Sequence, residues 1–205
     1  YMEKNPTEMI AVTGGGSGTG LSSLISGTCD IAMSSRNIKD KEIALAAKRN
    51  IQSNEISVAL DGLAVIVHPS NPLSEITVDQ LADLYTGRIT NWSQLGGRDA
   101  EVVLLSREVN SGTHVYFKEH VLRHGRAESK EEFTPEALLL PSSQAIADEA
   151  AQNPDAIGYY GMGYVSPDVK ALKVAAAPGS ASVAPTLESV QSNAYPIARP
   201  LIMYT

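Results

Sequence analysis

Hydrophobic and polar positions change their period several times along the first fifty residues. Residues 8–13 are apolar and β-branched, which predicts a strand that leads into a glycine-rich loop. In residues 17–26 the apolar side chains recur on one face of a helix, and Gly27 is a suitable residue to end it because glycine accepts positive φ. Residues 29–35 predict a second strand. This order of strand, helix and strand is typical of an α/β fold with a mostly parallel sheet.

A helix is expected next, over residues 40–50. Its apolar positions suggest that Ile43, Ala44 and Ala47 face the protein interior. The stretch 56–69 is mostly apolar and β-branched, with Asp61 and Gly62 in its middle, and it is too long for one typical strand. We therefore expect a strand that leaves one domain and enters another.

The remaining pattern predicts a second set of helices and strands, inserted between early and late parts of the first. Thr77 and Gln80 have the spacing of a capping box, which marks the start of a helix that closes at Gly87. Further elements are expected as strands at 101–108, 170–175 and 196–205, a helix within 110–125, and a helix followed by a strand within 141–161.

Composition excludes some classes of protein and permits others. The chain of 205 residues has a formal net charge of −7, which argues against a nucleic-acid-binding protein. A small-anion site remains compatible with this charge, because helix N-termini and one or two arginines can bind an anion within an acidic protein. Cys29 is the single cysteine, so no intrachain disulfide forms. No apolar run approaches the roughly 18 residues of a membrane span.

The glycine loop at residues 14–20, GGGSGTG, fails three motifs that it resembles at first sight. A phosphate-binding P-loop needs Lys after its last glycine, and Leu21 stands there. The dinucleotide fingerprint needs Gly or Ala at a position occupied by Thr19 or Leu21, depending on the frame. A nucleophile elbow centred on Ser17 lacks its second glycine, again because of Thr19. What remains is a tight turn or a loop whose N–H groups and hydroxyl bind an anion.

Two further segments carry the same chemistry at predicted strand ends. Residues 111–113, Ser-Gly-Thr, follow a strand that ends near Arg107, and residues 34–36, Ser-Ser-Arg, follow another. Hydroxyls, free N–H groups and a guanidinium are the donors that a tetrahedral oxyanion requires. Ligands of α/β proteins bind outside the carboxyl ends of strands. Three such ends therefore predict one oxyanion site.

An ordered set of segments resembles the phosphate-binding proteins of ABC phosphate importers, over essentially the whole chain. The segments are GGGSGTG at 14–20, CDIAMSSRNI at 29–38, LADLYTGRITNW at 81–92, SREVNSGTHVYF at 106–117, AIGYYGMGYV at 156–165 and YPIARPLIMYT at 195–205.

The resemblance implies a type II periplasmic-binding-protein-like α/β fold, with two domains joined by a strand hinge and the anion in the cleft between them. Domain one is expected to comprise residues 1–62 and 166–205, and domain two residues 63–165. The hinge is expected within 60–67 and 156–161. The family pattern begins with one more strand and ends with further helices, so the resemblance also implies a chain truncated at both ends.

The resemblance also implies a set of phosphate-binding residues. Ser17 donates its hydroxyl, next to an N–H at Gly18, and Arg107 is the cationic clamp. Ser35 is a further expected ligand, at a position where many members have a carboxylate, and Val109 stands where some members have a second acid. These two departures make selectivity for phosphate less secure than oxyanion binding itself. Arg36 either adds a second positive charge or lies on the surface. The remaining expected ligands come from the start of the domain-two helix and are Ser111, Gly112 and Thr113.

The function implied is that of a receptor without catalytic activity. It captures inorganic phosphate by closing its two domains, and it then docks on the permease subunits of an ABC transporter. The resemblance implies an exported protein of the periplasm or extracytoplasmic space, peripheral to the membrane, that needs no cofactor. No metal site is expected either: His120 and His124 have a metal-binding spacing, but no third ligand is evident.

Two alternatives stay open. An enzyme that acts on a phosphate ester would need a base or a metal beside Ser17 or Ser111, and neither serine is directly flanked by a histidine or an acid. A signalling or adhesion protein of the same fold, with a degraded site, is the second alternative.

Overall fold

The computed structural model describes all residues, 1–205, and has a mixed α/β architecture. The helices are α1 (Ser17–Ser26), α2 (Asp40–Ala47), α3 (Val78–Tyr85), α4 (Gly112–Phe117), α5 (Ser143–Gln152) and α6 (Leu187–Gln191). Three short helical turns are η1 (Trp92–Leu95), η2 (Lys118–Leu122) and η3 (Met162–Tyr164). The strands are β1 (Ala32–Ser34), β2 (Glu55–Val67), β3 (Glu75–Thr77), β4 (Val103–Arg107), β5 (Leu138–Leu140), β6 (Ala156–Gly161), β7 (Lys170–Ala171), β8 (Lys173–Ala175) and β9 (Ala198–Tyr204).

The main sheet has the strand order β1-β9-β2-β6-β4-β5, and β7 pairs with β2 beside this path. Only β4 with β5 and β4 with β6 pair in parallel, and the other pairs of this sheet are antiparallel. Strands β3 and β8 form a separate parallel pair. The expectation of a mostly parallel sheet is therefore wrong, because β2 pairs antiparallel with β9, β6 and β7, and β9 pairs antiparallel with β1.

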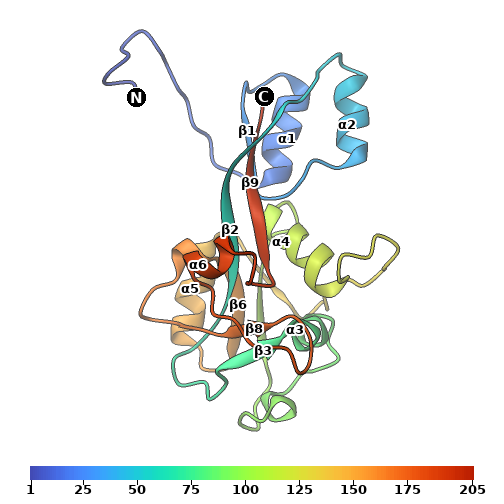
Figure 1. Ribbon diagram of the computed structural model, residues 1–205, viewed down its shortest axis with the longest axis vertical. Helices are drawn as coiled ribbons and strands as arrows, with labels where there is room; N and C mark the ends of the chain where they lie inside the picture. Colours follow the sequence, from blue (N-terminus) through green and yellow to red (C-terminus); the bar gives the residue numbers. More distant parts are fainter.

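The chain forms two lobes of unequal size (Figure 1). The small lobe contains α1, α2, β1 and the adjoining parts of β2 and β9, around a core of five buried side chains that includes Leu21 and Tyr204. The large lobe contains the other elements around a much larger core, in which Tyr85, Phe117 and Tyr159 pack ring against ring. Only β2 and β9 run continuously from one lobe to the other.

The segment 166–197 packs with the large lobe and not with the small one. Strand β7 pairs with β2 at Ile66 and Val67, and β8 pairs with β3. Leu172 and Val174 are buried in the large core. We propose that most of this segment belongs with the large lobe, and that only β9 and the residue after it return to the small lobe.

The crossing strands also differ from the expected hinge. The overlong segment is indeed one continuous strand, β2, whose small-lobe half is exposed and whose large-lobe half, from Leu63 to Val67, is fully buried. Strand β6 pairs only with that buried half, so it does not cross between lobes. The return crossing is β9, which pairs with β2 from Glu55 to Gly62.

Helix ends were predicted well, whereas the first strand was not. Gly27 ends α1 with φ 72°, and Thr77 caps α3 in a capping box with Gln80. Residues 8–13 form no strand, because no neighbouring chain segment pairs with them, and Met9 is 95% exposed. In α2 the inward face is also different: Ala46 is buried, and Ile43 is exposed. None of the helices has the length and apolar content needed to span a lipid bilayer.

Candidate functional site

A hollow of about 320 Å³ lies where the two lobes meet, between the starts of α1 and α4 and the ends of β1 and β4. It brings together six of the residues expected to bind an anion, which are Ser17, Ser35, Arg107, Ser111, Gly112 and Thr113. The other lining residues are Gly15, Gly16, Met33, Ser34, Val58, Leu201, Ile202 and Met203. No Asp or Glu is among them, so the wall carries one formal charge, the guanidinium of Arg107.

Glycines allow the two lobes to approach this closely. A Cβ atom at Gly112 would lie 2.1 Å from Ser17 Oγ and 2.4 Å from Ser35 Oγ, which is too close for any side chain. A Cβ atom at Gly16 would lie 2.4 Å from the carbonyl oxygen of Asn110. The backbone N–H of Gly18 donates to that same carbonyl at 3.2 Å. The two glycine-containing loops are thus in direct backbone contact across the lobe boundary.

Three hydroxyls in the hollow already accept a hydrogen bond from within the protein. Ser17 Oγ accepts from the backbone N–H of Ser35 at 3.0 Å. Ser111 Oγ caps α4 by accepting from the N–H of Thr113 at 3.2 Å. Thr113 Oγ1 accepts from Arg199 Nη2 at 3.0 Å. Because a hydroxyl has one proton and two lone pairs, each of these groups keeps its proton available to donate to a ligand.

Arg107 stands at the end of β4 and is anchored on the large lobe. Its Nη1 donates to Ser143 Oγ at 3.3 Å, and its Nη2 donates to the carbonyl of Pro141 at 3.1 Å. Its Nε is buried without a partner. An unpaired buried donor is costly, so the guanidinium retains hydrogen-bonding capacity that an anion would satisfy.

Behind Thr113 lies an ion pair that the sequence analysis missed. Arg199 on β9 and Asp61 on β2 are register partners, and Arg199 Nη2 lies 3.0 Å from Asp61 Oδ2. Arg199 is 4% exposed and its charge lies 5.6 Å from the ring centre of Tyr116. Burial lowers the pKa of Arg199, and Asp61 opposes that shift. The only sequence signal was a charged residue inside each of two apolar strand segments.

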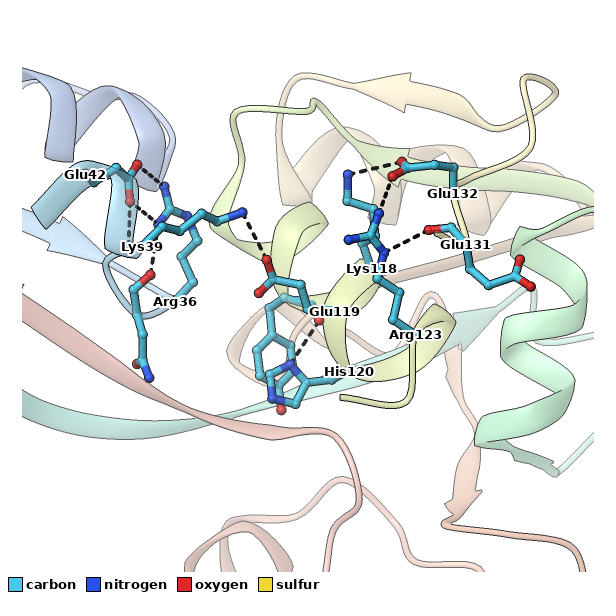
Figure 2. A network of polar contacts seen from close by, with 11 residues as sticks. Arg36, Lys39, Glu42, Lys118, Glu119, His120, Arg123, Glu131 and Glu132 are labelled. Carbon is cyan, nitrogen blue, oxygen red and sulfur yellow. Dashed lines mark hydrogen bonds and ion pairs between the residues drawn. The ribbon is translucent and has the colours of Figure 1, made fainter. Parts of the chain in front are cut away.

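Two expected ligands do not line the hollow. The N–H of Gly18 is already bonded to Asn110 across the boundary, as described above. Arg36 does not line the hollow and does not lie on the surface: it is 6% exposed and forms two hydrogen bonds with Glu42, at 2.8 and 2.9 Å (Figure 2). Burial acts to raise the pKa of Glu42, but Arg36 and the N–H of Lys39 outweigh it and lower that pKa.

The histidines near the site serve other contacts. His114 Nδ1 lies 3.2 Å from Ser106 Oγ, which in turn lies 2.7 Å from the hydroxyl of Tyr159, and its ring stacks on Phe133. Burial lowers the pKa of His114 to about 4. It therefore has no hydrogen bond with Ser111 and does not act on it as a base in this arrangement.

His120 and His124, whose spacing had raised the question of a metal, take different partners. The ring of His120 stacks on Tyr116 with centroids 4.0 Å apart. His124 Nδ1 lies 3.7 Å from Asp79 Oδ1. The two histidines thus take part in separate local contacts.

A family model described as "PBP superfamily domain" matches residues 1–205. The chain belongs to the PBP superfamily. Within the superfamily, it is 35% identical over 198 residues to the phosphate-binding protein PstS of Bacillus subtilis, covering 96% of this chain and 60% of the relative. It is 30% identical over 207 residues to PstS of Borreliella burgdorferi, covering 100% of this chain and 71% of that protein. This PBP-superfamily chain thus spans about three fifths of the length of the Bacillus relative.

Solved structures of the superfamily match the whole fold. A putative phosphate ABC transporter substrate-binding protein from Clostridium perfringens, solved with bound phosphate, matches with a TM-score of 0.85 and 35% identity, covering 99% of this chain and 76% of that one. An ABC-type phosphate transport receptor from Vibrio cholerae matches with a TM-score of 0.77 and 30% identity, covering 100% and 78%. The expected type II binding-protein fold is confirmed.

Proposed function

We propose that this PBP-superfamily chain binds inorganic phosphate in the hollow between its lobes and delivers it to an ABC importer. The names of its relatives support this proposal, since they are phosphate-binding proteins and phosphate transport receptors. Delivery to permease subunits and a place in the periplasm or extracytoplasmic space are parts of the same proposal.

The observation that carries the proposal is the polarity of the hollow. Three hydroxyls have a lone pair occupied by an internal donor, and a guanidinium with an unpartnered Nε stands beside them. A phosphate oxygen accepts hydrogen bonds and carries negative charge, so each of these groups matches it. Ser17 belongs to the small lobe and Ser111 and Thr113 to the large one. An anion that bonds all three stabilises the closed arrangement of the lobes.

The same geometry argues against phosphate-ester hydrolysis. Attack by a serine needs a base within hydrogen-bonding reach, and the hydrogen bonds of Ser17 and Ser111 involve only backbone N–H groups and the hydroxyl of Ser35. His114 is directed to Ser106 on the core side of β4. We infer a binding protein without catalytic activity.

Calorimetric titration of the chain with inorganic phosphate tests the proposal. We expect saturable binding with one site per chain, and a loss of about 2 to 3 kcal/mol in binding free energy for Arg107→Ala, as for a charged hydrogen-bonding partner. Arg88→Ala is the matched control, because Arg88 pairs with Asp83 and Glu131 on the surface, outside the hollow.

Absence of phosphate binding by the wild-type chain contradicts the proposal. Equal affinity of the Arg107→Ala variant and the wild type removes Arg107 from the site. A chromogenic phosphate ester is tested in parallel, and turnover that disappears in Ser111→Ala would establish the enzymatic alternative instead.

A further inference from the structure

We infer that the hollow recognises dianionic tetrahedral oxyanions by charge and shape, and that it does not discriminate hydrogen phosphate from sulfate. The inference rests on the proposed function, because it concerns the ligand class of the same site. It follows from the direction of the hydrogen bonds around the hollow and from the absence of a carboxylate in its wall.

The hydroxyls are fixed as donors by their neighbours. The N–H of Ser35 points at Ser17 Oγ, the N–H of Thr113 at Ser111 Oγ, and Nη2 of Arg199 at Thr113 Oγ1. None of these internal donors can reverse its role, since a backbone N–H and a guanidinium have no acceptor atom. Each of these three hydroxyls therefore has its own proton left to donate, to a ligand in the hollow or, for Ser17, to Ser35 Oγ.

No carboxylate is placed to accept a proton from a ligand. Asp61 is engaged by Arg199 through both Nε and Nη2, at 3.2 and 3.0 Å, and does not line the hollow. Val109 is 67% exposed and also lies outside the lining, as does the exposed Glu108. The wall of the hollow therefore contains no carboxylate and carries no negative charge.

Ser35 is the one hydroxyl without a fixed direction. Its Oγ lies 3.4 Å from Ser17 Oγ, and either atom can donate. When hydrogen phosphate presents its proton, Ser35 Oγ can accept a hydrogen bond from it. When sulfate presents an unprotonated oxygen, the same hydroxyl can rotate and donate a hydrogen bond to that oxygen. A carboxylate at this position would accept but never donate, and it would repel sulfate. The serine consequently allows both anions.

The ligand's own ionisation then governs the pH dependence. Phosphate gains a second proton on acidification from neutral pH, losing one negative charge and one acceptor for the donors of the hollow. Sulfate stays a dianion at all pH values of interest. Arg107 is the one charged side chain in the wall, Asp61 behind it is ion-paired with Arg199, and burial lowers the pKa of His114 to about 4. We therefore expect acidification from pH 8 to pH 5.5 to weaken phosphate binding and to leave sulfate binding unchanged.

The experiment is calorimetric titration of the full 205-residue chain with sodium phosphate and with sodium sulfate, at pH 8 and at pH 5.5. At pH 8 we expect the two dissociation constants to agree within tenfold. At pH 5.5 we expect weaker phosphate binding and the same sulfate binding. Phosphate binding with sulfate more than tenfold weaker overturns the inference and leaves the proposed function standing. Failure of both anions to bind overturns both.

The variant Ser35→Asp introduces a selectivity for phosphate over sulfate if the inference is correct. A carboxylate in contact with sulfate places like charges together, so the sulfate affinity is expected to fall on the order of a hundredfold relative to phosphate. Ser35→Asn is the matched control, because it adds the same bulk without the charge and leaves the ratio of the two affinities within tenfold. Unchanged sulfate binding by a folded Ser35→Asp variant contradicts the inference. The wild-type titrations decide the question on their own if that variant does not fold.

Discussion

Arg199 and Asp61 face each other across β9 and β2, the two strands that join the lobes, and Arg199 also donates to Thr113 in the wall of the hollow. One buried guanidinium thus connects the crossing strands to the start of α4.

Removal of Asp61 leaves the charge of Arg199 buried without its partner. We expect Asp61→Asn to reduce the free energy of unfolding by about 3 kcal/mol, at the lower end of the range for broken buried pairs because Thr113 and the ring of Tyr116 remain. Denaturation by urea followed by circular dichroism measures this. Asp83→Asn is the control, since its pair with Arg88 is exposed and contributes at most about 1 kcal/mol. Equal losses for the two variants would contradict this account.

The contact of Gly112 with Ser17 and Ser35 predicts a strong effect of one added methyl group. Because a Cβ at Gly112 would lie 2.1 Å from Ser17 Oγ, Gly112→Ala forces the lobes apart or displaces Ser17. We expect phosphate affinity to fall at least tenfold, or about 1.4 kcal/mol, together with a larger radius of gyration in small-angle scattering.

Gly163→Ala is the matched control for this variant. A Cβ atom at Gly163 meets nothing within 4 Å, so its affinity and its scattering curve should equal those of the wild type. A Gly112→Ala variant that binds phosphate normally would show that the two loops are not held at this distance in solution.

An ion pair also spans the lobes on the outer side of the hollow. Lys39, at the start of α2, places its Nζ 3.0 Å from Glu119 Oε1 in η2, and Figure 2 shows the two side chains extended toward each other. Both are partly exposed, so the pair is expected to contribute at most about 1 kcal/mol to closure and to weaken with salt. We expect Lys39→Ala and Glu119→Ala each to reduce phosphate affinity up to fivefold at low ionic strength.

A double-mutant cycle separates this pair from other effects of the two substitutions. The double variant should be no weaker than either single variant, because both remove the same interaction. Strictly additive losses would show that Lys39 and Glu119 act independently of each other.

Sequence reasoning found the parts of the site that depend on local chemistry. Ser17, Arg107 and residues 111–113 stand where strands end and helices begin, and such positions meet at one edge of a sheet whatever the rest of the fold. The pairing of Asp61 with Arg199 depends on the register of two strands whose residues are 138 positions apart, which no local pattern encodes.

Two expectations failed because they also depend on contacts between residues that are far apart in the sequence. Residues 8–13 have strand-forming side chains, but a strand forms only with a partner, and none pairs with them. Ile43 is the more apolar residue of α2, yet Ala46 is the buried one, because the rest of the small lobe determines which face of this short helix is covered. The spacing of apolar residues along a helix predicts that one of its faces is buried, but tertiary packing decides which face that is.

Stability should fall in acid partly because of His114. Burial lowers its pKa to about 4, against about 6.5 in the unfolded chain, so the unfolded state binds the proton more readily. A histidine with a lowered folded-state pKa leaves stability intact above pH 6.5 and reduces it as the pH falls from 6.5 to 4. The effect on the free energy of unfolding is up to about 3 kcal/mol.

Urea unfolding between pH 4 and pH 7.5 measures this effect, and His114→Gln should flatten the acid part of the curve of stability against pH. His68→Gln is the matched substitution outside the core, because the ring of His68 is bonded only to Ser70. Parallel pH profiles for the wild type and His114→Gln would show that other groups govern the acid limb.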